Sequence, residues 1–187
     1  MKIILASGSP RRSQILRDGG YNFEVCVPDV EEISGDDPFS TVVYNAALKA
    51  EKASESCEEG AIVIAADTLV SCDGRVLGKP KSFAEAKQML KFLSGREQMV
   101  MTAVCIVCGD SKIEFTEESS LFFKKLSDDQ IDEYHSLVDP LDKAGAYNID
   151  EFGDMLVDRL EGSYENVMGL PIDALKSYLS QMNVSVN

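Results

Sequence analysis

The chain has 187 residues, 44% of them hydrophobic and 27% charged, which is the composition of an ordinary globular protein able to bury a core. Its 32 acidic residues outnumber its 18 basic ones and give a formal net charge of −14, which argues against a nucleic-acid-binding protein because such proteins need a basic surface. No apolar run reaches the length of a secretion signal or the roughly 20 residues of a membrane span, so we expect a cytoplasmic protein with no membrane partner.

The first half of the chain alternates strands and helices. The apolar stretches KIILA, NFEVCVP and AIVIAADTLV predict three strands, the last of which ends at Asp67-Thr68. Ser9-Pro10 and Asp37-Pro38 each pair a helix N-cap with a proline at the first helical position. They predict a helix over residues 10–18 and a longer one over residues 38–56. The segment CDGR then has the composition of a hairpin turn.

Longer strands dominate the second half. Ser82 and Glu85 form a capping-box pattern for a helix that runs to about residue 93. QMVMTAVCIVCGD and KIEFTEESSLFFKKL face each other across Gly109-Asp110 and predict an antiparallel hairpin. A helix near Ser127, a strand at DMLVDRLEG and a final helix opened by Pro171 complete the set. The alternation predicts one α/β domain over residues 1–187, with a mixed twisted sheet, flanking helices and two lobes around a cleft.

Five cysteines, an odd number, lie at positions 26, 57, 72, 105 and 108. Without a secretion signal, we expect free reduced thiols. Cys105 and Cys108 have C-x-x-C spacing, but they fall in a predicted strand, where residues three apart face opposite sides of the sheet. A zinc or redox site is therefore disfavoured. The single histidine, His135, has no serine or cysteine motif beside it and is interpreted as an incidental helix residue.

Two arginines stand where a helix ordinarily disfavours cations. Arg11 and Arg12 follow Ser9-Pro10 and so lie in the first helical turn, where the helix dipole is positive. Each cation there should cost about 0.3 to 1 kcal/mol unless an anion is bound, because the same free N–H groups attract phosphate. We therefore expect each arginine to bind an anionic ligand, and its removal to stabilise the free protein slightly.

Several other polar groups fall at predicted strand ends or in loops, where sites are usually built. They are Glu31-Glu32, Asp67-Thr68, the GKP segment that contains Lys79, and LDKAGAYNID. Taken singly, each has an ordinary reading as a solvated or turn-capping group. Together, carboxylates for a hard divalent cation and cations near a helix N-terminus fit a polyphosphate ligand. The chain contains neither a Walker-type G-x-x-x-x-G-K-[ST] segment nor a dinucleotide-binding G-x-G-x-x-G segment.

Seven segments resemble one known family: ILASGSPRR, AADTLV, LGKP, LSG, MTAV, DKAGAY and GSYENVMGLP, in this order from near the first residue to Pro171. They are similar to the signature of the Maf-type nucleoside triphosphate pyrophosphatases. The resemblance implies an elongated mixed sheet of the ITPase-like kind around a deep cleft, and often a homodimer. It also implies hydrolysis of a nucleoside triphosphate to the monophosphate and pyrophosphate with Mg²⁺ or Mn²⁺, to remove non-canonical or excess nucleotides.

The resemblance assigns roles to individual positions. Ser7, Arg11 and Arg12 match the phosphate-binding loop, and Lys49 matches a helix lysine, for which Lys52 is a rival. The catalytic and metal-binding groups of the family fall on Glu32, a metal ligand, on Asp67, a general base or metal ligand, and on Lys79 of GKP. A metal with Arg and Lys on the other phosphate oxygens would offset the charge of the triphosphate during attack of water. The alternative is a non-catalytic nucleotide-binding regulator of septum formation.

One position departs from the family pattern. Many members that act on dTTP and UTP continue DKAGAY with Gly-Ile-Gln-Gly, whereas this chain has NIDEFG and so places Asp150 where that glutamine stands. A carboxylate accepts hydrogen bonds but cannot donate them to the carbonyls of uracil or thymine. We retain dTTP and UTP as the expected substrates, with Arg11, Thr68 and Asp150 as the expected specificity positions. Asp150 also leaves room for bases richer in donors, such as cytosine or a modified guanine.

Overall fold

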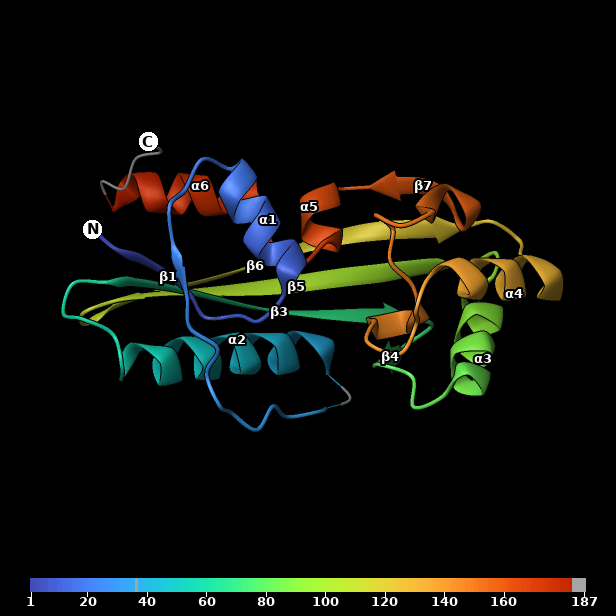
Figure 1. Ribbon diagram of the computed structural model, residues 1–187, viewed down its shortest axis with the longest axis horizontal. Coiled ribbons are helices and arrows are strands. Elements are labelled where there is room, and N and C mark those ends of the chain that lie inside the picture. Colours follow the sequence, from blue (N-terminus) through green and yellow to red (C-terminus); the bar gives the residue numbers. More distant parts are fainter. Residues whose placement is uncertain (36, 183–187) are drawn as a thin grey trace. The chain divides into compact units, whose positions relative to one another are not determined.

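The computed structural model describes residues 1–35 and 37–182 (Figure 1). The chain divides into two compact units. The first comprises Met1–Thr68, Met101–Glu117 and the chain from Glu165 onward, and the second comprises Leu69–Val100 and Glu118–Tyr164. A single two-lobed domain around a cleft stays a prediction.

A seven-stranded sheet runs through the chain in the order β2-β1-β3-β5-β6-β7, with β4 paired to β3. The strands are β1 (Ile3–Leu5), β2 (Glu24–Val25), β3 (Ile62–Cys72), β4 (Arg75–Leu77), β5 (Glu97–Cys108), β6 (Ser111–Phe123) and β7 (Val157–Glu161). β1 is parallel to both β2 and β3, whereas β4 is antiparallel to β3 and β7 is antiparallel to β6. The predicted mixed α/β sheet is confirmed.

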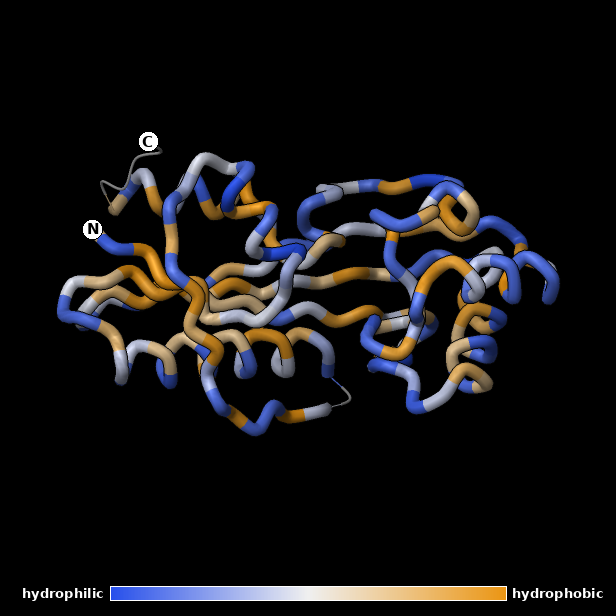
Figure 2. The backbone as a smooth tube through the Cα atoms, viewed as in Figure 1, coloured by the Kyte–Doolittle hydropathy of each residue, from blue (hydrophilic) through white to orange (hydrophobic). Residues whose placement is uncertain are grey.

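Helices cover both faces of the sheet in the first unit. Figure 1 shows α1 (Pro10–Asp18) and α6 (Ile172–Gln181) on one face and α2 (Pro38–Ser54) on the other. Side chains of α1 and α6 pack on apolar residues of β1, β3 and β5 in the main core, and Figure 2 shows β1 in the colours of hydrophobic residues. α2 buries Val42, Ala46, Ala50 and Ala53, which share one face at helical spacing. A short helix, α5 (Tyr164–Val167), precedes α6.

The second unit packs α3 (Phe83–Leu93), α4 (Asp128–Leu137) and two short 3₁₀ turns, η1 (Ala144–Ala146) and η2 (Gly153–Met155), with its strands. Lys87 and Lys91 of α3 each form a 2.6 Å ion pair with an aspartate of α4. Ser127 caps α4 in a capping box with Gln130. The helix starts at Pro10 and Pro38 confirm the predictions made from their N-caps, and α4 begins next to Ser127, as expected.

Three local predictions differ from the structure. β2 has two residues rather than seven, and both of its side chains are exposed, so burial does not extend it. β3 does not end at Asp67-Thr68 but continues to Cys72, because its last three residues pair with β4. Ser82 caps α3 as predicted, but the Glu85 carboxylate accepts from the Lys81 N–H rather than closing the box on Ser82.

The cysteines are free thiols, as predicted. Cys105 and Cys108 both lie on β5, and burial of Cys105 raises the pKa of its thiol to about 12, so it stays protonated. Within residues 1–35 and 37–182, no three His, Cys, Asp or Glu side chains gather as a metal cluster. In the same residues, no helix combines the length and the apolar character needed to cross a membrane.

Candidate active site

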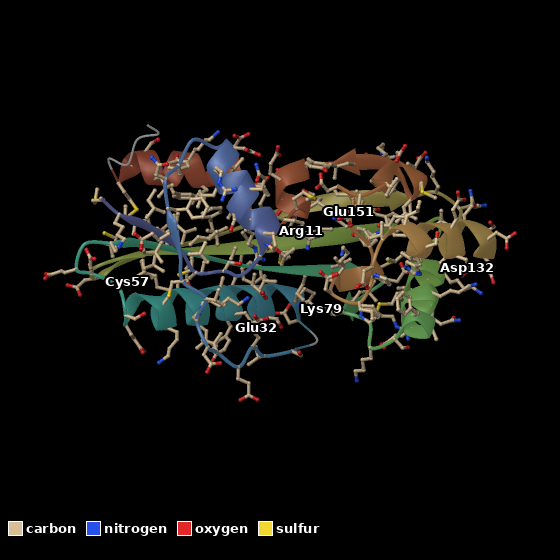
Figure 3. The ribbon with its side chains drawn as sticks, viewed as in Figure 1. Arg11, Glu32, Cys57, Lys79, Asp132 and Glu151 are labelled. Carbon is tan, nitrogen blue, oxygen red and sulfur yellow. The ribbon has the colours of Figure 1, made fainter. Side chains whose placement is uncertain are left out.

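Asp67, Lys49 and Glu32 form a charged cluster in the first unit. The Lys49 Nζ atom lies 2.7 Å from Asp67 Oδ1 and 2.9 Å from Glu32 Oε1, so one ammonium bridges two carboxylates. The Lys49 and Asp67 side chains are only 9% and 10% exposed, whereas that of Glu32 is 52% exposed. The cluster therefore has a buried end at β3 and a solvent-facing end at Glu32, which Figure 3 labels beside α2.

The local sequence explains how this cluster assembles. β3 buries Ile62 to Ala66 as a continuous apolar run before Asp67. α2 places Asn45 and Lys49 four residues apart, on the same face of the helix, and both side chains bond to Asp67. Lys52, the rival for the lysine role, is exposed and pairs with Glu55 at 2.6 Å instead. Of the two lysines, Lys49 is the one that contacts Asp67 and Glu32.

A second cluster joins the start of α1 to the same strand. Arg12 donates from Nη1 to Ser7 Oγ at 3.2 Å, from Nη2 to Thr68 Oγ1 at 3.0 Å and from Nε to the Gly169 carbonyl at 2.8 Å. The Thr102 hydroxyl donates to the Asn166 carbonyl at 3.0 Å and accepts from the Thr68 hydroxyl at 2.9 Å. Thr68 has thus used its one proton and accepts from Arg12, so any further hydrogen bond it makes must be as an acceptor.

The two clusters share an electrostatic environment. Burial lowers the pKa of the Arg12 guanidinium, and the charge of Asp67 and Glu32 acts in the opposite direction. Arg11 lies beside it in the first turn of α1, where Figure 3 labels it, and its charge also lowers the pKa of Arg12. Ser7, Arg12 and Thr68 therefore lie together, next to the acidic cluster in the field of its carboxylates.

Arg12 corrects one expectation. The helix dipole alone predicts that its removal stabilises the free protein, but this guanidinium donates three hydrogen bonds, two of them to groups from distant parts of the chain. Those bonds outweigh a repulsion of about 0.3 to 1 kcal/mol, because bonds made by a charged donor contribute about 1.5 to 3 kcal/mol. Arg12 thus has a structural role in addition to any contact with an anion.

The remaining predicted residues belong to the second unit. Lys79 is exposed and follows Gly78, whose carbonyl accepts from the Gly145 N–H at 3.1 Å. Asp150 is exposed, and its Oδ1 accepts from the Tyr164 hydroxyl at 3.1 Å. The hydrogen bond between Gly145 and Gly78 joins the backbones of the GKP and DKAGAY loops.

The loop before Asp150 is anchored on α4. The Tyr134 hydroxyl donates to the Asn148 carbonyl at 3.0 Å and accepts from the Asn148 N–H at 2.9 Å. His135 Nε2 lies 3.2 Å from the Ala146 carbonyl. The backbone that leads to Asp150 is therefore held by two side chains of one helix.

Comparison with known proteins shows the family to which this chain belongs. The family model described as "Maf-like protein" matches residues 2–182. The chain belongs to the Maf-like protein family. Relatives from Bacillus cereus (strain Q1) and Bacillus anthracis, each named dTTP/UTP pyrophosphatase, are 43% identical to it over 99% of this chain and 97% of theirs. The structure of the Staphylococcus aureus Ham1 protein has a similar fold, with a TM-score of 0.55 and 20% identity over 97% of this chain and 100% of that one.

Four residues that contact the predicted site residues escaped sequence reasoning: Asn45, Thr102, Tyr164 and Gly169. Asn45 bonds to Asp67, and Thr102 bonds to Thr68. Each partner is distant in sequence, so no local spacing marks Asn45 or Thr102. Gly169 has φ +100°, and a Cβ atom there would lie 3.2 Å from Thr68 Oγ1 and 3.3 Å from Arg12 Nε. GSYENVMGLP, which contains Tyr164 and Gly169, served only to recognise the family.

Proposed function

We propose that this Maf-like protein is a nucleoside triphosphate pyrophosphatase, which hydrolyses a triphosphate to the monophosphate and pyrophosphate to remove excess or non-canonical nucleotides. The observation that carries the proposal is the Asp67–Lys49–Glu32 cluster beside Ser7 and Arg12, in a chain 43% identical to relatives named dTTP/UTP pyrophosphatase. Carboxylates for a cation and a helix N-terminus with arginines for phosphate are what such hydrolysis requires.

In the reaction, one P–O bond forms, one P–O bond breaks and one proton is transferred. The oxygen of a water molecule attacks the α-phosphorus, and the bond from that phosphorus to the oxygen shared with the β-phosphate breaks. The electron pair leaves with pyrophosphate, and the proton of the water passes to a base. Asp67 either takes this proton or holds the cation. Ser7, Arg11 and Arg12, with Lys79 on the family pattern, are proposed to bind phosphate oxygens.

The two carboxylates fit a divalent cation. They already share one cationic atom, Lys49 Nζ, which lies within 3 Å of an oxygen of each, 2.7 Å from Asp67 and 2.9 Å from Glu32. Mg²⁺ is commonly held by one or two carboxylates with substrate phosphates, so a third protein carboxylate is not required. We propose that Glu32 and Asp67 bind Mg²⁺ or Mn²⁺, which would neutralise charge on the phosphate oxygens.

For the base, we propose thymine or uracil, on the strength of the relatives' names. Asp150 is the proposed specificity residue, with Thr68 and Arg11. Since the Tyr164 hydroxyl donates to Asp150 Oδ1, the other oxygen of this carboxylate is the acceptor for a base N–H. The N3–H of thymine or uracil is such a donor, and so is an amino group of cytosine or guanine.

The base assignment predicts the effect of Asp150→Gln. A glutamine amide both donates and accepts, so the variant should raise kcat/KM for dTTP and UTP relative to CTP by about 10-fold, the value of one good hydrogen bond. Tyr164→Phe, which removes the donor to Asp150, is the matched control and should alter the ranking less. The same ranking of substrates in the wild type and in Asp150→Gln would show that Asp150 does not contact the base.

The test of the function is direct. Pyrophosphate release is measured over a panel of normal and modified triphosphates with Mg²⁺, for the wild type and for Asp67→Asn. We expect release by the wild type and a loss of at least about 100-fold in kcat for Asp67→Asn, because a base or metal ligand is removed. The control is Glu55→Gln, which breaks the exposed pair with Lys52. Nucleotide binding without release would favour the septum-regulator alternative.

Two further assignments complete the proposal. The free cysteines, of which Cys26, Cys57 and Cys108 are partly accessible, suit the reducing cytoplasm. A homodimer, implied by the family resemblance, is tested by sedimentation of the purified chain with and without triphosphate.

A further inference from the structure

The buried side chain of Asn45 makes three hydrogen bonds at the candidate site. It is 2% exposed and lies on α2, one helical turn before Lys49. Its Oδ1 atom accepts from the Ile33 N–H at 2.9 Å, and its Nδ2 atom donates to the Ile33 carbonyl and to Asp67 Oδ2, both at 3.1 Å. Both N–H bonds of the amide and its oxygen are therefore in use.

The three bonds allow only one orientation of the amide. In the reverse orientation, the NH₂ group would face the Ile33 N–H, and the oxygen would face the Ile33 carbonyl and the Asp67 carboxylate. Like groups would then oppose each other at all three contacts. The side chain is consequently a rigid link of fixed polarity between the backbone at Ile33 and the carboxylate of Asp67.

This link supplies what secondary structure does not. Glu32 lies between the end of β2 at Val25 and the start of α2 at Pro38, and residues 26–35 contain neither helix nor strand. Ile33 is 45% exposed, so burial of this residue does not anchor the segment. The Asn45 amide instead binds both backbone groups of Ile33, the residue that follows Glu32, and so sets where the Glu32 carboxylate can reach.

We infer that Asn45 is a positioning residue, which holds the Glu32 segment against Asp67 so that the two carboxylates are pre-arranged for a divalent cation. The inference rests on the proposed function only for the part that this cation plays in hydrolysis. Both N–H donors of the Asn45 amide are in use, and the residue acts through Asp67 and the Ile33 backbone. Positioning groups behind metal ligands change metal affinity or activity by about 10- to 100-fold when removed.

The experiment measures Mn²⁺ binding to the nucleotide-free protein by electron paramagnetic resonance, together with kcat, KM and thermal unfolding. Asn45→Ala and Asn45→Leu both remove the three hydrogen bonds, and the leucine keeps the branched shape of the side chain. We expect the Mn²⁺ dissociation constant to rise about 10-fold or more, and kcat to fall with a smaller change in KM. Two variants are used so that a failure of one to fold leaves the other.

Ala50→Gly is the matched control. Ala50 lies on the same helix, is fully buried and has no bond to Asp67 or Ile33, so its replacement loosens α2 without touching the link. The control should lower the melting temperature while Mn²⁺ affinity and kcat stay as in the wild type. Equal losses of Mn²⁺ affinity in Ala50→Gly and Asn45→Leu would mean that general destabilisation explains the effect, and would overturn the inference.

The outcomes separate this inference from the proposed function. Weaker Mn²⁺ binding in the Asn45 variants, with no pyrophosphate release by any form of the protein, would support the positioning role and reject the enzyme. Unchanged Mn²⁺ binding and kcat in the Asn45 variants, with release by the wild type, would reject the positioning role and support the enzyme. Absence of Mn²⁺ binding by the wild type would also overturn the inference.

Discussion

At the scale of single residues, the site depends on two buried cations with close polar partners. Lys49 stands between two carboxylates, and Arg12 donates to three acceptors from separate segments. These two cations differ from the surface pairs of the chain, such as Lys52–Glu55, which are exposed and contribute little. A substitution at either buried cation should therefore affect both stability and binding.

Arg12→Ala tests this dual role. We expect the free energy of unfolding to fall by about 1 to 3 kcal/mol, since the partners of the guanidinium at Thr68, Ser7 and Gly169 lose their donor. Arg11→Ala, in the same helical turn, is the comparison: it should weaken triphosphate binding but stabilise the free protein slightly, because a cation leaves the positive end of the helix. Chemical denaturation without nucleotide gives the stabilities, and equal values for the two variants would reject a structural role for Arg12.

At the scale of elements, sequence reasoning succeeded where the rules are local. The N-caps Ser9, Asp37 and Ser82 predicted three helix starts because a cap and its helix are adjacent in sequence. It failed where partners are distant: Asn45 escaped notice because its partners lie 12 and 22 residues away. The end of β3 was misplaced although its β4 partners are close in sequence, because the polar pair Asp67-Thr68 interrupts the apolar run there.

The turn before α6 provides a test at this scale. Gly169→Ala places a methyl group 3.2 Å from Thr68 Oγ1 and 3.3 Å from Arg12 Nε, in a backbone conformation with φ +100°. Gly74→Ala, in the β3–β4 hairpin at φ +73°, adds the methyl group in open space. Both should lose about 1 to 2 kcal/mol of stability from the left-handed backbone. Loss of triphosphate affinity in Gly169→Ala alone is expected in a fluorescent-nucleotide titration, and equal affinity in both variants would contradict a contribution of this turn to the site.

At the scale of the whole molecule, a net charge of −14 is set against an anionic substrate. The field of the excess acidic residues acts over the Debye length, which is about 30 Å at 0.01 M salt and about 10 Å at 0.1 M. Contacts such as those of Arg12 and Lys49 act at about 3 Å and are screened much less. The repulsion that slows the approach of a triphosphate and the attraction that holds it thus respond differently to salt.

This difference predicts an unusual salt dependence. At saturating Mg²⁺, kcat/KM for the triphosphate should rise a few-fold as monovalent salt increases from about 0.01 to 0.1 M, because the long-range repulsion is removed first. A protein that attracts its nucleotide through a basic surface would show a steady fall over the same range. Replacing exposed Glu118 and Asp158 by their amides makes the field less negative without altering the described contacts at Asp67 or Arg12, and should flatten the rise. A steady fall for the wild type from the lowest salt would mean that the local cations, and not the net charge, control the approach of the substrate.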